Sequence, residues 1–407
     1  MRWIIMALLL GVFIFETAVS ILNQKHSLRP IPRNVRDVYD KEGYKKWLAY
    51  SLEGHRYGLV QRGFNLMVFL ALLMGPFASL ARWVSLQTTS PIFQSLLFLG
   101  IYQTFVLVLG LPFGLYRTFS LEERHGFNRT TKKMFFRDTL VSYVVTLALG
   151  GLVLASIHAL FLRYADNLWL FVLITWLGLA VLLVFVAAVL GKWFMRLFNR
   201  FTPLPEGDLR TRIEELGTTV GFNVKAILVM DASKRSTKSN AAFMGIGKTR
   251  EVILFDTLLE RMSDDEIVAV LAHELGHAVH KDTWRLLARQ IVVMGLFAVG
   301  IGFVLQVPAF YTAFGFSDVH FGFATILFSI LLEPISLLLG IPLNLLSRQA
   351  EYKADAFAAE QTDRKWLISA LKTLSRENLA NLNPHPLSVH LYYSHPPMGE
   401  RIGALQG

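Results

Sequence analysis

The sequence contains no cysteine, which excludes disulfide bonds and thiolate chemistry. Any metal site in this chain must therefore be built from histidine and carboxylate side chains. Charge is scarce as well: only 17% of the 407 residues are charged, whereas 53% are hydrophobic and the mean hydropathy is +0.44. A soluble domain has more charge and less apolar surface. The composition therefore predicts a multi-pass membrane protein.

Seven apolar stretches are close to or above the length that a helix needs to cross the hydrocarbon core of a membrane. They cover residues 3–22, 64–81, 92–116, 139–162, 167–191, 286–312 and 320–347. The first stretch could also be a signal peptide cleaved near Ser20, but it is long for that role, so we expect a retained span. Four parts result: 1–191 with five spans, 192–284 polar, 285–347 with two spans, and 348–407 polar.

Lys and Arg alternate between the loops that join these spans. The first, third and fifth loops are rich in them, whereas the second and fourth contain only Arg82 and Arg163 and the sixth has none. Because basic loops stay in the cytoplasm, we expect the N-terminus outside and both polar segments, 192–284 and 348–407, inside. The net charge of +10 then reflects topology and anionic lipid, so we predict no nucleic-acid partner.

Residues 192–284 are predicted to form a small α/β unit. Three stretches have the composition of strands, and turn residues separate them. The expected strands cover 226–230, 239–244 and 251–255, with turns at 234–238 and 245–248. We expect the strand at 251–255 to hold an extended substrate by β-augmentation.

A zinc-binding motif follows these strands. His273 and His277 are four residues apart, so on a helix both imidazoles face the same side and can bind one Zn²⁺ ion. Glu274 adjoins the first histidine and can accept a proton from a zinc-activated water. Ser263 and Glu266 form a capping box, which indicates that the motif lies on a helix. On its own the motif could also be a helix with two surface histidines.

The third metal ligand is predicted to be Glu351, on a helix that follows the last span. Asp355 is one turn further on, where its carboxylate can accept the N–H of a zinc-bound imidazole and fix its tautomer. Without the histidine motif, these two residues would be read as an exposed acidic helix. With it, we predict one zinc ion per chain.

Several motifs together resemble those of the type I CAAX prenyl endopeptidases, membrane zinc metalloproteases that process prenylated C-termini. The resemblance covers nearly the whole chain, including the seven spans and the position of the polar insertion. The motifs that carry it are Leu271–His277, Ser347–Phe357, Lys238–Phe243 with Val252–Leu259, Tyr393–Ile402 and, more weakly, Glu122–Asn128.

The resemblance implies a fold, a reaction and further site residues. The fold would be mainly α-helical, with seven helices around an intramembrane chamber and a small α/β metalloprotease unit on its cytoplasmic side. The resemblance implies that Asn240 binds the substrate backbone, that His395 helps to hold the oxyanion, and that Arg401 supports the site. The chain after Arg401 is short and has no ER-retrieval signal, which favours a prokaryotic plasma membrane over the ER.

The predicted activity is zinc-dependent hydrolysis of peptide bonds near the C-terminus of prenylated CAAX-type substrates. One alternative is an HtpX-like protease that removes misfolded membrane proteins. An alternative of another class is a transporter, or a membrane protein with a structural zinc ion. Glu274 discriminates between these classes, because a structural or transport site needs no carboxylate beside its first ligand.

Overall fold

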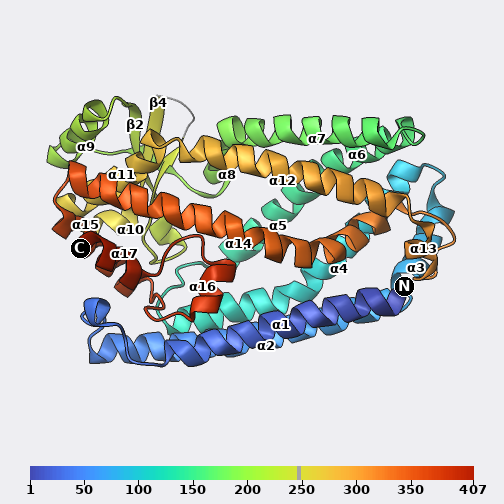
Figure 1. The fold of residues 1–407 in the computed structure, drawn as a ribbon, viewed down its shortest axis with the longest axis horizontal. Helices are drawn as coiled ribbons and strands as arrows, with labels where there is room; N and C mark the ends of the chain where they lie inside the picture. The colour runs from blue at the N-terminus through green and yellow to red at the C-terminus, as the bar shows by residue number, and fades with distance from the viewer. Residues whose placement is uncertain (245–248) are drawn as a thin grey trace.

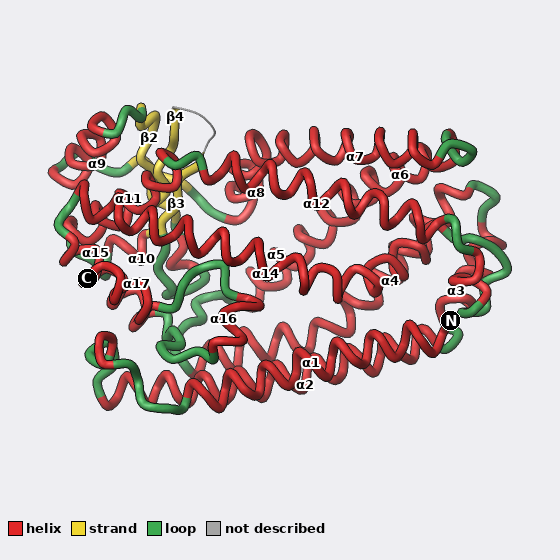
Figure 2. The backbone as a smooth tube through the Cα atoms, in the orientation of Figure 1, coloured by secondary structure: helices red, strands yellow, loops and turns green. Residues whose placement is uncertain are grey.

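Long helices that run along a common direction form most of the molecule, and a small sheet lies at one end of them (Figures 1 and 2). The computed structural model describes residues 1–244 and 249–407. The N-terminus lies at the end away from the sheet, and the C-terminus lies close to the sheet (Figure 1). The predicted mainly helical fold is therefore confirmed.

Within residues 1–244 and 249–407, six helical segments are long and apolar enough to cross a membrane. They are Arg2–Ser27 (α1), Pro91–Glu122, Lys132–Arg163, Leu168–Leu190, Asp282–Leu305 (α12) and Phe321–Gln361 (α14). Three of these segments combine α-helix with a π-helical turn. They contain α4 (Pro91–Tyr116), α5 (Lys132–Val145) with α6 (Gly151–Arg163), and α7 (Leu168–Phe185). A bent pair, α2 (Lys41–Leu73) and α3 (Pro76–Gln87), gives a seventh when the pair is counted as one span. The predicted number of spans matches this count.

The second span differs from the straight apolar helix expected at 64–81. Its first helix begins at Lys41, inside the region expected to be a polar loop, where the Asp40 side chain accepts a hydrogen bond from the Gly43 N–H at 2.6 Å. The chain then bends by 56° into α3, which begins at Pro76. Proline has no N–H and fits the first turn of a helix, so a new helix starts there.

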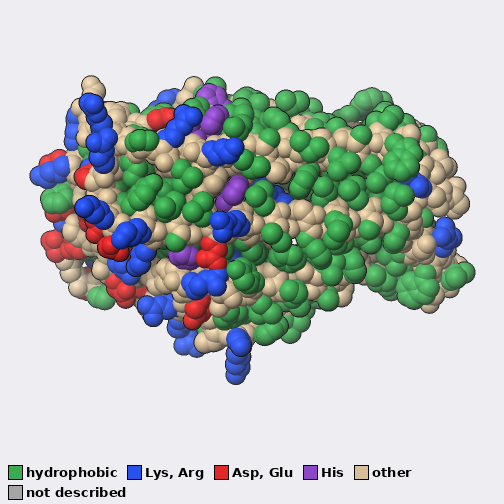
Figure 3. Space-filling view, turned by 90° about the horizontal axis from the view of Figure 1, so that it is seen from below, with side chains coloured by type: hydrophobic (Ala, Val, Ile, Leu, Met, Phe, Trp, Pro, Cys, Tyr) green, Lys and Arg blue, Asp and Glu red, His purple; other side chains and the backbone are tan. Residues whose placement is uncertain are grey.

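The two largest hydrophobic cores among the described residues lie at the two ends of the molecule. One core packs the apolar ends of α1, α3, α4, α7, α12 and α14 against each other. The other surrounds the helix that carries the zinc motif. Figure 3 shows charged side chains gathered at the sheet end and an apolar surface over most of the rest. This distribution is the one expected for helices that cross a bilayer below a polar head.

In the described part of the chain the sheet has four strands in the order β1-β2-β4-β3: Phe201–Pro203 (β1), Asn223–Met230 (β2), Thr249–Phe255 (β4) and Ala241–Met244 (β3). β4 pairs with β2 in parallel and with β3 antiparallel. The prediction that residues 251–255 bind substrate as an added strand is therefore wrong, because both edges of β4 are already paired. The outer edge belongs to β3. β1 was not predicted, and the turn expected at 245–248 lies outside the described residues.

Shorter helices surround the sheet and connect it to the spans. They are Gly191–Phe198 (α8), Asp208–Thr219 (α9), Asp256–Leu259 (α10), Asp264–Val279 (α11), Pro308–Thr312 (α13), Arg364–Glu377 (α15), Pro386–Tyr392 (α16) and Met398–Gln406 (α17). The 41-residue helix α14 continues from the membrane end into the head, so the last span and the helix expected to carry Glu351 are one element. Helix α11 packs against α9, α14 and α15.

Candidate metal and catalytic site

Helix α11 presents the zinc motif from a fixed position in the polar core. The predicted capping box closes its first turn: the Glu266 N–H donates to Ser263 Oγ at 3.4 Å, and the Ser263 N–H donates to Glu266 Oε2 at 2.9 Å. Leu271, Ala272 and Leu275 are buried among neighbouring helices. Helix α11 packs against α14, and both histidines of the motif face Glu351 on that helix.

The three predicted metal ligands meet at one point between α11 and α14. One ligand atom from each of His273, His277 and Glu351 lies within 4.8 Å of the others. The His273 Nε2 is 3.4 Å from Glu351 Oε2, and the His277 Nε2 is 3.3 Å from Glu351 Oε1. Two imidazole nitrogens and a carboxylate oxygen are the donor set of His₂Glu metal sites.

The other nitrogen of each imidazole is already held by a carboxylate. His273 Nδ1 lies 2.9 Å from Asp355 Oδ1, and His277 Nδ1 lies 3.0 Å from Asp282 Oδ2. Both Nε2 atoms therefore carry a lone pair directed at the meeting point. The Oε2 atom of Glu351 is buried and has no hydrogen-bond partner in the described part of the chain. An unsatisfied buried oxygen beside two free imidazole nitrogens fits a divalent metal ion.

Arg401 links the carboxylates behind the ligands. It is almost fully buried, and its Nε and Nη2 atoms donate to the two oxygens of Asp355 at 2.8 and 2.5 Å. Its Nη1 atom is 3.6 Å from Glu351 Oε2. A bidentate arginine holds a carboxylate in one orientation, so Asp355 is fixed where it faces His273. The structure thus brings Asp355 and Arg401 to the ligands.

Glu274 faces the site without forming a bond within it. Its carboxylate makes no hydrogen bond with any residue that the structure describes, although the residue is partly buried. Burial raises the pKa of this carboxyl group, while the neighbouring His273 and His277 lower it. A raised pKa makes this carboxylate a better proton acceptor than an ordinary glutamate. This position therefore suits a general base.

His395 lies on the open side of the same site. Its Nε2 atom is 3.2 Å from Glu351 Oε1, and its side chain is 65% exposed. The Nδ1 atom lies 3.0 Å from the Ser394 hydroxyl oxygen. His395 therefore borders both the ligands and the solvent, where a substrate can reach it.

The structure does not bring Asn240 into the ligand cluster. It lies exposed at the start of β3, and its Oδ1 atom accepts a hydrogen bond from the Ala241 N–H at 2.9 Å. The Asn240 carbonyl oxygen accepts from the Phe255 N–H at 3.2 Å, which joins it to β4. Asn240 thus lies just before the first residue of β3, the outermost strand.

Asp282 was not identified from the sequence. Helix α11 ends at Val279, Lys281 adopts a left-handed conformation with φ of 58°, and α12 begins at Asp282. This turn folds Asp282 back onto His277. Helical spacing could not have found the contact, because the two residues lie on different helices.

Arg348 and Asn344 were also missed as residues that hold the His395 segment. Arg348 is buried, and its Nη1 atom donates to the carbonyl oxygens of Val389 and Tyr393 at 2.9 and 2.7 Å. The Asn344 side chain donates to the Leu391 carbonyl oxygen at 2.8 Å. These bonds join the chain before His395 to the same helix, α14, that carries Glu351.

The two ligand helices approach each other closely at Gly276. A Cβ atom at this position would lie 3.0 Å from the Ala354 Cα and 3.2 Å from the Ala354 carbonyl oxygen. Gly276 lies between the two histidine ligands, and Ala354 lies between Glu351 and Asp355. The lack of a side chain here allows α14 to bring its carboxylates within reach of the imidazoles.

Two protein-family models cover most of the chain. Residues 20–200 match the model of the CAAX prenyl protease N-terminal region with five membrane helices, and residues 203–407 match the model of peptidase family M48. The second match includes the three metal ligands, Glu274 and His395.

Known proteins resemble the chain over its whole length. The CAAX prenyl protease 1 homolog of Arabidopsis thaliana is 34% identical over 99% of this chain and 97% of its own. CAAX prenyl protease 1 of Saccharomyces cerevisiae is 32% identical over 97% of this chain and 92% of its own. The crystal structure of S. mikatae Ste24p superposes with a TM-score of 0.93 at 29% identity, covering 100% of this chain and 99% of the other. The chain therefore belongs to peptidase family M48 and is a CAAX prenyl protease 1 homologue, a multi-pass membrane metalloprotease.

Proposed function

We propose that this protein is a zinc endopeptidase that cuts a peptide bond near the C-terminus of prenylated CAAX-type proteins. The observation that carries the proposal is Glu274, an unpaired carboxylate beside two histidines and a glutamate that can hold one metal ion. The names of the relatives supply the substrate class. Substrates with a lipid anchor would reach the site from the bilayer.

His273, His277 and Glu351 would hold the zinc ion. The donor set suits zinc, and the chain has no cysteine that could provide a softer site. When bound, zinc supplies a Lewis acid that polarises the peptide carbonyl group and makes a coordinated water more acidic. Asp355 and Asp282 would keep the two imidazoles in the tautomer that leaves Nε2 free.

The protein's own groups would move the protons. Glu274 accepts a proton from the attacking water and then delivers it to the amine that leaves. His395 donates a hydrogen bond to the oxyanion that forms at the carbonyl carbon. Arg401 keeps Asp355 in place, and Asn240 binds the substrate backbone at the end of β3. The free edge of β3 is the edge where an extended peptide can add a strand.

Two observations favour this function over the alternatives. Membership of a peptidase family favours hydrolysis over transport or a structural metal ion. The match of residues 20–200 to the N-terminal region of CAAX prenyl proteases favours prenylated substrates over the broader HtpX-like role.

We further propose that the N-terminus faces outside and that the catalytic head, residues 192–284 with 348–407, lies in the cytoplasm. The alternating basic loops and the charged surface at the sheet end support this orientation. The relatives named above are eukaryotic, so they do not support the expected prokaryotic plasma membrane.

The decisive experiment compares two peptides with the purified protein in detergent. A farnesylated CAAX peptide should be cleaved, and its unprenylated twin should be cleaved more slowly. Glu274→Gln should retain one zinc ion per chain, because the metal ligands remain. Its cleavage rate should fall by a factor of about 10²–10⁴, because the general base is gone. Near-normal peptidase activity in this zinc-loaded variant would contradict the role of Glu274. Zinc that stays bound after His277→Ala and Glu351→Ala together would contradict the metal site.

A further inference from the structure

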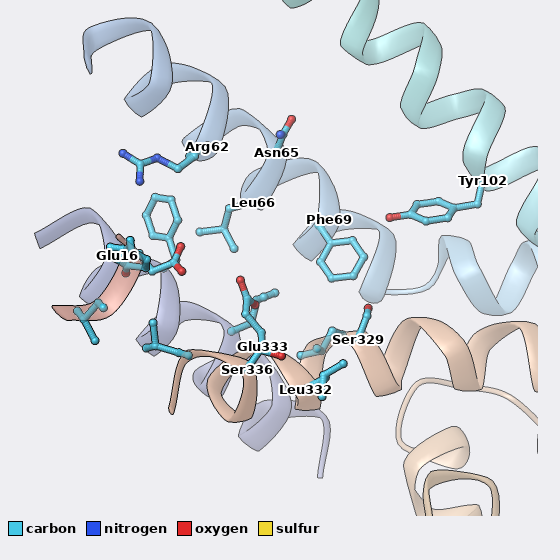
Figure 4. A pocket seen from close by; sticks show the side chains of 16 residues that line it. Glu16, Arg62, Asn65, Leu66, Phe69, Tyr102, Ser329, Leu332, Glu333 and Ser336 are labelled. Atoms are coloured by element: carbon cyan, nitrogen blue, oxygen red, sulfur yellow. The ribbon is translucent and has the colours of Figure 1, made fainter. Parts of the chain in front are cut away.

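A second site lies within the membrane helices, away from the metal ligands. Residues of helices α1, α2, α4, α14 and α16 line an open cavity of about 770 Å³ (Figure 4). This volume is in the range of cavities that bind small ligands. Leu9, Leu66, Phe69 and Leu337 form much of its apolar wall.

Three charged side chains share this cavity without pairing. Glu16 of α1 and Glu333 of α14 are near enough for their charges to interact, and neither carboxylate has a hydrogen bond or ion pair with a residue that the structure describes. Arg62 of α2 donates to Ser20 Oγ at 3.0 Å and to the Gly58 carbonyl oxygen at 3.3 Å. It has no carboxylate partner in the same described residues.

Unpaired charges of both signs are costly among membrane helices unless water or a ligand compensates them. Two neighbouring carboxylates attract a positively charged group, and a guanidinium without a carboxylate partner attracts a negatively charged one. The walls between them favour aliphatic groups. A ligand that satisfies all three features has an ammonium group, a carboxylate and apolar side chains. A short apolar peptide with free termini has this chemistry.

We propose that this cavity binds the short C-terminal peptide that cleavage releases. The new amino group would lie at Glu16 and Glu333, the C-terminal carboxylate at Arg62, and the aliphatic side chains along the apolar wall. This inference rests on the proposed function, because that cleavage is the source of the peptide. An isoprenoid chain is a poorer occupant, since it would leave the carboxylates without a partner.

The cavity is separate from the catalytic site. Leu391 and Tyr392 line the cavity, and His395 lies three residues after Tyr392 in the chain. Helix α14 carries both Glu333 and Glu351, and its rise between them is roughly 27 Å. A tripeptide spans at most roughly 11 Å, so a peptide in the cavity cannot also contact the metal ligands. The cavity can therefore hold the product while the catalytic site accepts another substrate.

Equilibrium dialysis with the full-length zinc protein tests this assignment. The probe is the tripeptide Val-Ile-Leu with free termini, compared with its N-acetylated and C-amidated forms. We expect each modification to weaken binding at least tenfold, because each removes one charged contact. Glu16→Gln with Glu333→Gln should weaken binding of the free peptide equally and leave the acetylated form unchanged. Arg62→Met should weaken binding of the free peptide and leave binding of the amidated form unchanged.

Controls separate this cavity from other sites. Glu360→Gln changes an exposed carboxylate on the same helix, α14, and should leave peptide binding unchanged. A hydroxamate that binds the metal should not displace the peptide. The acetylated peptide also reports folding of the double variant without relying on its charges.

Three results would overturn the inference. The free and acetylated peptides could bind equally well, or the hydroxamate could displace the peptide. The variants at Glu16 with Glu333, or at Arg62, could lose binding of farnesol while they keep binding of the peptide. Cleavage of the farnesylated CAAX peptide is measured separately. Failure of that cleavage refutes the proposed function, whereas normal cleavage with charge-independent tripeptide binding refutes only this site.

Discussion

Replacing Gly276 by alanine should separate the two helices that hold the metal. The added Cβ would lie 3.0 Å from the Ala354 Cα and 3.2 Å from a ring carbon of Phe357. Carbon atoms prefer about 3.5–4.0 Å, so α14 must move by about half an ångström. Ala354 is three residues from Glu351 and adjacent to Asp355, so both carboxylates would move away from the imidazoles.

The size of the effect follows from two opposing contributions. Alanine stabilises a helix by roughly 0.5–1 kcal/mol relative to glycine, whereas overpacking costs roughly 1–3 kcal/mol. We therefore expect a net loss of about 1 kcal/mol in the free energy of unfolding. A displacement of 1 Å can lower the rate about 10²-fold. A displacement of about half an ångström should therefore lower kcat/KM about tenfold. Zinc affinity, measured by competition with a chelator, should fall as well.

Gly54→Ala is the matched control. Gly54 lies in α2, and a Cβ there meets no atom within 4 Å. This change should leave zinc affinity and kcat/KM unaltered and raise thermal stability slightly. If Gly276→Ala also raises thermal stability and leaves zinc affinity unaltered, the close approach at Ala354 does not set the distance between the ligands.

Three further predictions follow from the contacts of the site and from the loops. Asp282→Ala should weaken zinc binding about 10–100-fold in a chelator competition, because His277 loses the partner of its Nδ1 atom. Glu260→Ala, at an exposed position, should leave zinc affinity unchanged. Equal zinc affinity of Asp282→Ala and the wild type would argue against the contact. Arg348→Met should lower kcat about tenfold or more at full zinc occupancy, since two bonds that hold the His395 segment are lost; partial recovery by Arg348→Lys would support positioning, and unchanged kcat would refute it. For topology, the chain has no cysteine, so Asp318→Cys should react with an impermeant maleimide on intact cells and Glu206→Cys should not; the reverse pattern would invert the proposed orientation.

The helical part of the fold could be predicted because its signals are local. Long apolar runs indicate membrane spans, and the capping box marks the start of α11 independently of its surroundings. The bend at Gly75 was missed because hydropathy averages over a window and does not register the helix start at Pro76. The short strand β1 was missed because three residues carry too little pattern; its partner, β2, defines it.

The metal ligands could be expected from motifs, but their supporting contacts could not. The four-residue spacing of the two histidines is a property of one helix. Asp282 reaches His277 only through the left-handed turn at Lys281, and Arg348 acts on carbonyl oxygens, which have no sequence signature. The β-augmentation prediction failed for a similar reason. A strand's composition does not reveal whether it will lie at the centre or the edge of a sheet.

Helix α14 couples the thickness of the bilayer to the geometry of the metal site. One continuous helix crosses the membrane and carries Glu351 and Asp355 in the part that lies in the head. Over a lever of roughly 30 Å, a tilt of about 2° displaces the far end by about 1 Å. Helices adjust their tilt to the thickness of the hydrocarbon core. Cleavage rates measured in bilayers of different acyl-chain length should therefore pass through an optimum. The acyl chains around α14 would then tune the distance between a metal ion and its third ligand.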